Sequence, residues 1–337
     1  MPVCKSIKIK FPARLNAMAI DPSKIAISKN HVYTPGEVVF SIGTYRSATA
    51  SLRNDDKLVI TGNSAKHSLI KHSFLIMKRA LRLTKGLNIE IFDAADCRHC
   101  GLGSSSGLIA TVACAINELY GNPIDDLLLI KYLAQNHGEE IDGTNDYLYP
   151  VQCIGGSAAS GICNQGLIIL AGESRVIATM KIPSEFKVII GIPKDFHDID
   201  SKAQLDQEVK NMKKFVETGR KYGKQIAYNV LHIMLPAVSQ GNLRKIGDVI
   251  YDYRYRMGSI KNCAYAYPHL PKICDRLSFL KRRNIAEVLS ISSVGPAVFA
   301  ISKNVDLCTT AFEREDLKTM VTTIDNARYR VLERINV

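Results

Sequence analysis

The chain has 337 residues, of which 46% are hydrophobic and 23% are charged. This is the composition of a folded globular protein, and no segment contains the long apolar run that a membrane span needs, which argues against an integral membrane protein. The length exceeds one ordinary core and predicts two closely packed domains with a cleft between them. We place their boundary after residue 183, giving domains 1–183 and 184–337.

The net charge of +12 favours an anionic partner, which could be a nucleic acid, a membrane surface or a small polyphosphate. The sequence contains neither a basic strand interleaved with aromatic residues nor a recognition-helix motif, so we expect no nucleic-acid partner and no membrane. The first residues alternate like a strand and lack the apolar stretch of a signal peptide, which predicts a cytoplasmic protein. Nine scattered cysteines indicate reduced thiols, and the pair Cys97 and Cys100 lacks the second pair that a zinc site needs.

The first half of the chain alternates apolar and polar residues, which predicts strands at residues 6–10, 38–42, 47–52, 57–61 and 87–91. A helix should follow Lys66, because apolar residues from Leu69 to Leu83 recur near the 3.6-residue period. A second helix should begin at a glycine-serine loop and end near Gly121, and a third should span 125–137. Residues 157–162 and 166–171 predict a hairpin.

Helices dominate the second half. After a buried strand at 186–192, we expect helices at 203–218, 224–240, 242–257 and 270–282. Strands at 286–291 and 297–302, a helix at 309–321 and a last strand at 329–332 complete the chain. Strands and helices that follow each other without regular alternation predict an α+β fold.

A glycine-serine loop lies between a predicted strand and an amphipathic helix, and its polar and glycine residues are His99, Gly101, Gly103, Ser104, Ser105 and Ser106. Glycines let backbone amides approach an anion, serines donate hydrogen bonds, and the helix dipole adds partial positive charge. The loop is not a Walker motif or a dinucleotide fingerprint. A serine-rich helix cap would look similar, but three capping residues behind two glycines exceed what one helix start requires. We therefore predict a phosphate-binding loop.

An acidic segment follows the third predicted helix. An ordinary helix end explains Glu139 and Asp142, whereas Asp146 is a candidate to hold Mg²⁺ or to take a proton from a hydroxyl.

Two further segments carry polar groups. The turn with Ser292, Ser293 and Gly295 could face the loop across the cleft, although a plain glycine-proline turn would look similar. After the first strand, Arg14 could pair with a phosphate and Asp21 with a metal or a sugar hydroxyl, and ordinary charges at a strand end are an equal alternative.

Taken in this order, these segments resemble the GHMP kinase superfamily over nearly the whole chain. The segment 101–105 is similar to its phosphate-loop motif, and 293–296 is similar to its C-terminal glycine-rich turn. The resemblance implies a two-domain GHMP-kinase fold, with an N-terminal domain like domain 2 of ribosomal protein S5 and a ferredoxin-like C-terminal domain. It also implies an active site between the domains and a homodimer.

Within the superfamily, residues 13–21, 99–104, 234–247 and 292–296 are most similar to β-ribofuranosylaminobenzene 5′-phosphate synthases (β-RFAP synthases) and related ribosyl-phosphate C-transferases. Two departures stand out. The glycine-rich region that follows Asp21 in those enzymes is reduced here to Pro35 and Gly36, and their arginine-bearing segment before the central serine is missing. The segment 140–156 is instead similar to homoserine kinase. The likeness therefore leaves donor and acceptor open.

The synthase likeness implies a transferase that joins phosphoribosyl pyrophosphate to an aromatic carboxylate acceptor, with loss of CO₂ and pyrophosphate and with Mg²⁺ as cofactor. Its phosphate contacts would be the loop with Arg14, His99, Ser292, Ser293 and Gly295, its metal ligands Asp146 and Ser105, and its catalytic residues Asp146 and Asp21. The alternative is an ATP-dependent kinase of a small alcohol that uses the same nucleotide-binding loop for the triphosphate. A basic nucleic-acid binder without catalysis is the third alternative.

Overall fold

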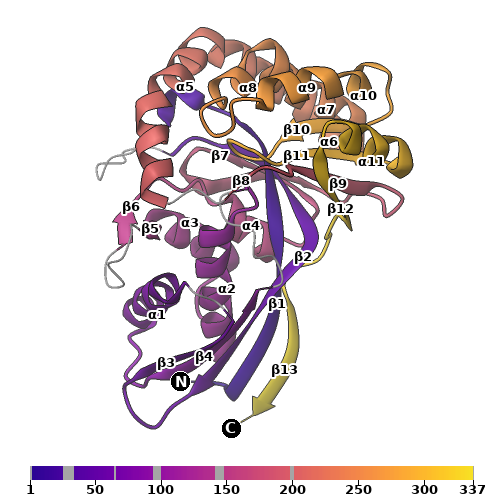
Figure 1. The fold of residues 1–337 in the computed structure, drawn as a ribbon. Helices are drawn as coiled ribbons and strands as arrows, with labels where there is room; N and C mark the ends of the chain where they lie inside the picture. Colours follow the sequence, from indigo (N-terminus) through magenta and orange to yellow (C-terminus); the bar gives the residue numbers. More distant parts are fainter. Residues whose placement is uncertain are drawn as a thin grey trace.

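The computed structural model describes residues 2–25, 34–63, 66–93, 100–140, 148–197 and 201–336. The chain forms two units, one above the other in Figure 1, and each unit is built on a sheet of its own with helices packed against it. The α+β class predicted from the sequence is confirmed.

The larger sheet has seven strands, and two long antiparallel strands, β1 (Cys4–Ala19) and β2 (Glu37–Leu52), form its centre. The other strands are β3 (Leu58–Gly62), β4 (Leu87–Asp93), β7 (Leu167–Ala171), β8 (Arg175–Met180) and β13 (Arg330–Asn336). The second half of β2 pairs with β4, and its first half pairs with β7. The two strands predicted at 38–42 and 47–52 are therefore one, because a bulge at Gly43 and Thr44 bends β2 without breaking it.

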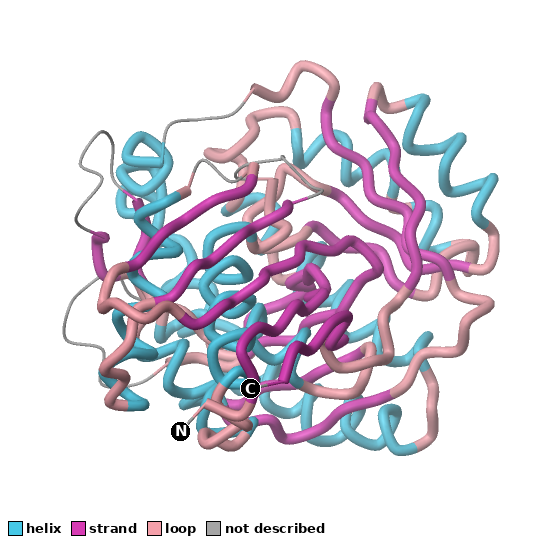
Figure 2. Tube along the Cα trace, turned by 90° about the horizontal axis from the view of Figure 1, so that it is seen from below, coloured by secondary structure: helices cyan, strands magenta, loops and turns pink. Residues whose placement is uncertain are grey.

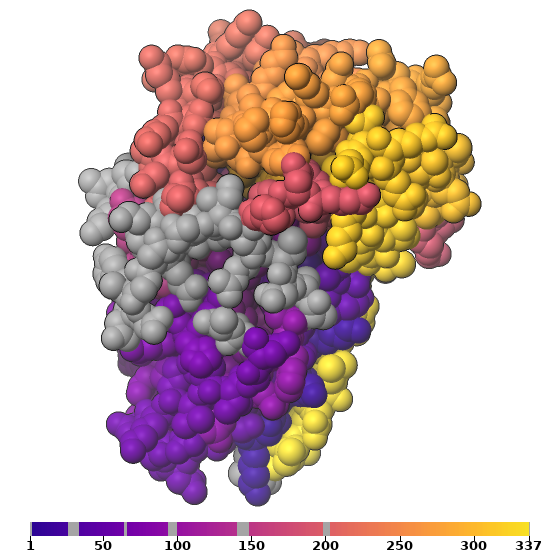
Figure 3. All heavy atoms as spheres, viewed as in Figure 1, coloured from indigo at the N-terminus to yellow at the C-terminus, as the bar shows by residue number. Residues whose placement is uncertain are grey.

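The last strand of the chain lies in the sheet that the first strand begins. Strand β13 pairs antiparallel with β1, and Figures 1 and 2 show the two chain ends close together. In the space-filling view of Figure 3 the same C-terminal segment lies against the N-terminal one at the lower right. The domain boundary at residue 183 stays a prediction, but the first unit also receives this strand from the end of the chain.

Four helices cover one face of the larger sheet: α1 (His67–Leu81), α2 (Ser104–Leu119), α3 (Asp126–Gln135) and α4 (Gly156–Ile162). Helix α2 is the central one and packs against α1, α4, β1 and β2. Its residues from Gly107 to Leu119 are buried, as expected for a helix that is apolar on every side. Two short strands, β5 (Gly138–Glu140) and β6 (Leu148–Pro150), pair beside α3.

The second unit is a four-stranded antiparallel sheet with a layer of helices. Its strands, in the spatial order β10-β11-β9-β12, are β9 (Lys187–Pro193), β10 (Val288–Ile291), β11 (Val298–Ser302) and β12 (Leu317–Thr323). Its helices are α5 (Ser201–Asn229), α6 (Leu235–Ser239), α7 (Leu243–Tyr251), α8 (Ser259–Asn262), α9 (Leu270–Leu277), α10 (Phe279–Arg282) and α11 (Val305–Arg314). Two π-helical segments, η3 (Val230–Met234) and η4 (Asp252–Arg256), precede α6 and follow α7, and two 3₁₀ turns, η1 (Pro22–Lys24) and η2 (Gly172–Ser174), lie in the first unit.

Two further predictions about strands are wrong. The hairpin at 157–162 and 166–171 is helix α4 followed by β7, because the small residues of α4 let it pack closely on β1, where a Cβ at Gly161 would overlap the ring of Phe11. The helix predicted at 309–321 ends at Arg314, and its remainder is β12, which pairs with β9.

The helix predicted at 203–218 and the first residues of the helix predicted at 224–240 are joined in α5, and the rest of the second helix forms η3 and α6. The predicted break contains Gly219, which does not end the helix but lets α5 approach the backbone of Ser23 in η1. Tertiary packing thus overrides the low helix propensity of glycine.

A buried guanidinium group joins the two units. The side chain of Arg254 in η4 is 3% exposed and donates hydrogen bonds to the carbonyls of Asn16 and Ala17 in β1 and of Ile291 in β10, at 2.7 to 3.2 Å. It also contacts the hydroxyl of Ser290. Because a buried carbonyl without a donor is costly, this one side chain fixes the position of β1 against β10.

The described residues bear only in part on the expectations about thiols, membrane spans, metal sites, location and oligomeric state. Their eight cysteines are free thiols, and Cys97 lies outside them. No described helix is both long and apolar enough to cross a bilayer, and no three His, Cys, Asp or Glu side chains of the described residues gather as metal ligands would. The cytoplasmic location and the homodimer stay predictions.

The glycines of two helices predict opposite effects of the same substitution. Gly161→Ala should lower the free energy of unfolding by about 1–3 kcal/mol, because the new methyl group overlaps the fully buried Phe11 ring. Gly223→Ala, in α5, meets no atom within 4 Å and should raise it by about 0.5–1 kcal/mol. Urea unfolding of both variants measures the difference. Equal stability of the two variants would contradict the close packing of α4 on β1.

Candidate functional site

The glycine-serine loop forms the amino end of α2. Gly101 and Gly103 have positive φ values of 89° and 71°, which glycine adopts without strain. Gly103 is the N-cap residue, and no side chain caps the helix. The three serines are therefore the first residues of the helix and not its cap, and the backbone amides of the first turn remain available to an anion.

Three cationic side chains surround this helix end. Lys66 Nζ donates to the hydroxyl of Ser104 at 2.9 Å, and the buried Arg46 donates to the carbonyl of Ser104 at 3.1 Å. Arg14 reaches the loop from β1, where its Nη1 atom donates to the carbonyl of Gly101 at 3.3 Å. Together with the helix dipole, these charges make the loop electropositive.

The turn after β10 holds the loop from the opposite side. The Ser292 hydroxyl donates to the carbonyl of Gly101 at 2.6 Å and accepts from the amide of Asn16 at 3.1 Å. The amide of Ser293 donates in turn to the Asn16 carbonyl at 2.9 Å. Segments separated by up to 276 residues thus meet in one hydrogen-bonded junction.

Two cavities adjoin at this junction. The smaller, of about 140 Å³, lies on the loop and is lined by Gly101 to Ser106, Arg14 and the turn 293–295. The larger, of about 310 Å³, extends away from the loop between α5 and β1. Residues of both cavities include Arg14, Ser106, Glu139 and Glu208, so an elongated ligand could occupy both.

Glu139 faces the loop from β5. Its carboxylate bonds to His137 Nε2 at 3.0 Å and to the Ser105 hydroxyl. Burial raises the pKa of Glu139, but His137, Ser105 and the charge of Lys66 outweigh that effect, so the pKa lies below its ordinary value. A carboxylate that stays ionised beside a phosphate loop is a candidate for holding a divalent cation.

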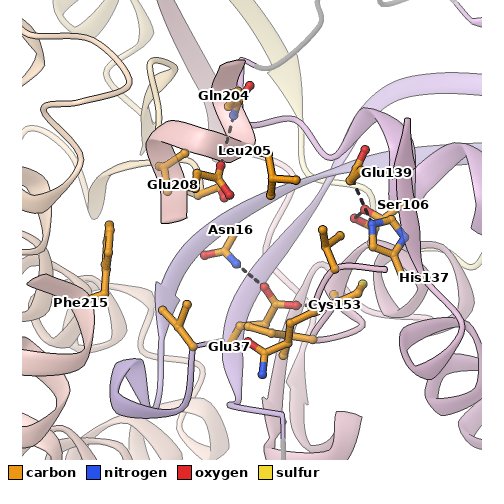
Figure 4. Close-up of a pocket in the computed structure, with 18 of the residues that line it drawn as sticks. Asn16, Glu37, Ser106, His137, Glu139, Cys153, Gln204, Leu205, Glu208 and Phe215 are labelled. Atoms are coloured by element: carbon orange, nitrogen blue, oxygen red, sulfur yellow. Dashed lines mark hydrogen bonds and ion pairs between the residues drawn. The ribbon is translucent and has the colours of Figure 1, made fainter. Parts of the chain in front are cut away.

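Glu37, at the start of β2, is a second carboxylate at the larger cavity (Figure 4). It is 3% exposed, accepts from the amide of Gly156 at 2.7 Å and bonds to the side chain of Asn16. Burial raises its pKa, although the charge of Arg14 and the two hydrogen bonds oppose the rise.

Glu208 projects from α5 on the other side of the cavity, next to Gln204 (Figure 4). Gln204 Nε2 donates to its carboxylate at 3.3 Å. Burial raises the pKa of Glu208 to about 7, the charge of Glu139 adds to the rise, and the hydrogen bond from Gln204 opposes it.

The structure brings together most of the predicted site residues. Those that line the smaller cavity are Arg14, Gly101, Gly103, Ser104, Ser105, Ser106, Ser293 and Gly295, and Ser292 supports the loop from behind. Asp21 lies elsewhere: it caps η1 by accepting from the amide and hydroxyl of Ser23 and lines neither cavity. Its catalytic role stays a prediction. His99 and Asp146 lie outside the described residues, so the phosphate contact of His99 and the catalytic and metal-binding roles of Asp146 stay predictions as well.

Sequence reasoning missed the three glutamates of the site. The sequence predicts an ordinary helix end at Glu139, and the residue lies just before the segment 140–156 that is similar to homoserine kinase. Glu37 was detectable as one acid at the start of an apolar run. Glu208 lies in a helix rich in charged residues, and nothing in that pattern distinguishes it from its exposed neighbours.

Comparison with known proteins agrees with this geometry. Residues 68–148, which include the loop and Glu139, match the family model described as GHMP kinases N terminal domain. None of the curated proteins compared with the chain is significantly similar to it in sequence.

Solved structures of the same fold span almost the whole chain. Homoserine kinase from Cytophaga hutchinsonii ATCC 33406 is 15% identical with a TM-score of 0.63, covering 97% of this chain and 98% of its own. Lactococcus lactis galactokinase, solved with galactose, is 14% identical with a TM-score of 0.69, covering 97% and 95%. The protein MDDEF, solved with MVAPP, AMPPCP and magnesium, is 15% identical with a TM-score of 0.62, covering 97% and 99%. The predicted GHMP-kinase fold is confirmed.

Titration of Glu208 predicts a pH-dependent stability difference. The unfolded carboxyl loses its proton near pH 4.5 and the folded one near pH 7, so the folded state binds more protons in that window and loses stability as the pH rises through it. Glu208→Gln removes this loss. Its free energy of unfolding relative to the wild type should therefore increase by about 1–3 kcal/mol between about pH 4 and pH 8, as measured by urea unfolding. Asp206→Asn, at an exposed position of the same helix, should show no such trend.

Proposed function

We propose that this chain, which has the GHMP-kinase fold, is an ATP-dependent kinase that phosphorylates a hydroxyl group of a small molecule. The observation that carries the proposal is the uncapped, electropositive amino end of α2 at the head of a larger cavity. Phosphoryl transfer requires mainly positioning and charge stabilisation, and this arrangement supplies both.

The loop suits the triphosphate of a nucleotide. Backbone amides of the first turn of α2 would bind phosphate oxygens, and Arg14 and Lys66 lie within reach of the same region through Gly101 and Ser104. Their charges would offset those of the phosphates and of a developing transition state.

Mg²⁺ fits the residues beside the loop. Glu139 and Ser105 supply a carboxylate and a hydroxyl oxygen that already contact each other. Mg²⁺ in kinases uses one or two carboxylates together with substrate phosphates and water, so a complete set of protein ligands is unnecessary. When bound, the ion would neutralise phosphate charge. We propose Glu139 in addition to Asp146 as its carboxylate ligand.

The larger cavity would hold the acceptor. It is lined by α5 on one side and by β1, β2 and the start of α4 on the other, and it connects directly with the cavity on the loop. Asn16, Gln152 and Ser157 offer it neutral hydrogen-bonding groups. An acceptor hydroxyl near Ser106 would therefore lie next to the transferred phosphoryl group.

The ribosyl-transferase alternative uses the same loop for pyrophosphate, so the loop itself does not distinguish the two reactions. What favours a kinase is that structural neighbours of nearly full coverage include homoserine kinase and galactokinase, and that a related fold was solved with AMPPCP and magnesium.

Donor binding tests the reaction class. With Mg²⁺ present, ATP should raise the melting temperature, because a ligand at a hundredfold excess over its Kd stabilises the folded state by about 2.7 kcal/mol. Phosphoribosyl pyrophosphate at the same concentration should have a smaller effect. The double variant Ser105→Ala, Ser106→Ala should lose most of the ATP-dependent rise, since both side chains line the loop cavity. A larger rise with phosphoribosyl pyrophosphate would reject the kinase in favour of the transferase.

Glu139→Gln tests the metal contact. The Mg²⁺ concentration at which ATP reaches half of its stabilising effect should increase at least about tenfold, because an ionised oxygen ligand is lost. Without Mg²⁺ the variant should bind ATP at least as tightly as the wild type, since a negative charge near the phosphates is removed. Glu217→Gln, on the exposed surface of α5, is the control and should match the wild type. Unchanged Mg²⁺ dependence in Glu139→Gln would exclude Glu139 as a metal ligand.

A further inference from the structure

One face of α5 forms a wall of the larger cavity. Gln204, Leu205, Glu208, Met212 and Phe215 recur at helical spacing and all line it. Figure 4 shows Gln204, Leu205 and Glu208 across the cavity from Asn16 and Glu37. The side chains of this face therefore contact whatever molecule the cavity accepts.

Two oxygen acceptors on this wall lack a suitable partner among the described residues. One is the carboxylate of Glu208, and the other is the Oε1 atom of Gln204. Within the part of the chain that the structure describes, Glu208 has no cationic partner, and its carboxylate accepts a hydrogen bond from the neutral amide of Gln204. The Oε1 atom of the same Gln204 is buried and accepts no hydrogen bond from any described residue. A carboxylate without a cation and a buried carbonyl without a donor favour a ligand group that brings both positive charge and several N–H donors.

Aromatic rings continue the wall. Phe215 and Tyr265 both line the cavity, and their rings meet at right angles, with centroids 6.4 Å apart and an interplanar angle of 86°. Aromatic faces tolerate a nearby ammonium group better than an anionic one. Met212 adds apolar surface that suits the methylene groups next to such a cation.

The charges of the rest of the cavity point to the same class of ligand. Arg14 donates hydrogen bonds to the carbonyl of Gly101 in the loop and to the hydroxyl of Ser157. A triphosphate on the loop would therefore contact Arg14. Glu37, like Glu208, then adds negative charge to the acceptor end. A carboxylate or phosphate on the acceptor would be repelled, whereas a cation would be attracted.

We propose that the acceptor is an alcohol that carries an ammonium group, which binds to Glu208 and the Oε1 atom of Gln204, with the rings of Phe215 and Tyr265 further along the same wall. The inference rests on the proposed kinase function and names the substrate class of that site. The hydroxyl of the acceptor lies toward Ser106 and the loop, and the ammonium group lies toward α5. Glu208 is thus a specificity-determining residue.

Three alcohols with the same four-carbon chain test the proposal: aminobutanol, butanediol and hydroxybutanoate, each with its two functional groups at opposite ends. Melting temperatures are measured with each alcohol in the presence of Mg²⁺ and a non-hydrolysable ATP analogue. The analogue alone is measured first, and its effect reports the proposed kinase function independently of the acceptor. We expect aminobutanol to stabilise the ternary complex most and hydroxybutanoate least.

Glu208→Gln should remove the preference, so that the shift with aminobutanol falls to that with butanediol. The shift with the ATP analogue should not decrease, because the lost negative charge also lines the cavity on the loop. Asp206→Asn removes a charge from an exposed position of α5 outside the cavity and should keep the wild-type order. Equal or absent shifts for the three alcohols, or a preference for hydroxybutanoate, would overturn the proposal. Loss of Mg²⁺-dependent nucleotide binding in Glu208→Gln would also overturn it, because Glu208 would then be a metal ligand.

Discussion

The site depends on the hydrogen bond from the Ser292 hydroxyl to the carbonyl of Gly101. Through it the turn after β10 holds the phosphate loop, and because Ser292 also accepts from the amide of Asn16, strand β1 is fixed to both. The carbonyl of Gly101 accepts hydrogen bonds from Ser292 and Arg14, which offset the repulsion that its oxygen would otherwise exert on an anion at the loop. Gly101 makes this possible, since its positive φ suits glycine and a Cβ would collide with the backbone of Ser292.

Charge is distributed unequally around that junction. Lys66, Arg46 and Arg14 surround the loop, whereas Glu37 lies at the cavity that leads away from it and Glu208 lies where the two cavities meet. The charged side chains at both ends of the site bond to neutral groups: Arg14 donates to Ser157, and Glu37 accepts from Gly156 and Asn16. Direct ion pairs across the cavity would cancel the charges that a ligand needs. The arrangement suits a ligand pair whose anionic part lies on the loop and whose cationic part lies against α5.

The loop, the turn 292–296 and Arg14 could be predicted from the sequence because each is a local pattern of glycines, hydroxyl groups or charge beside a strand end. The α+β class also followed from periodicity. Glu37, Glu139 and Glu208 could not be assigned in the same way, because their roles arise from tertiary contacts with Gly156, His137 and Gln204. The same limit explains the error at α4, whose small residues form a helix because they must fit beneath Phe11, and at α5, where Gly219 serves packing and does not end the helix.

The two units are joined at too many points for the cleft to open by rotation alone. Arg254 binds carbonyls of both β1 and β10, Asn326 exchanges two hydrogen bonds with the backbone of Ile182, and Ile324 forms a bridge with Ile42 in β2. Strand β13 then carries the chain back into the first sheet. Since relative rotation would break these contacts together, the distance between the loop and the turn 292–296 is set by the fold and not by the ligand. Selection among acceptors must therefore depend on the side chains that α5 presents, which makes the chemistry of that helix face, rather than closure of the cleft, the determinant of specificity.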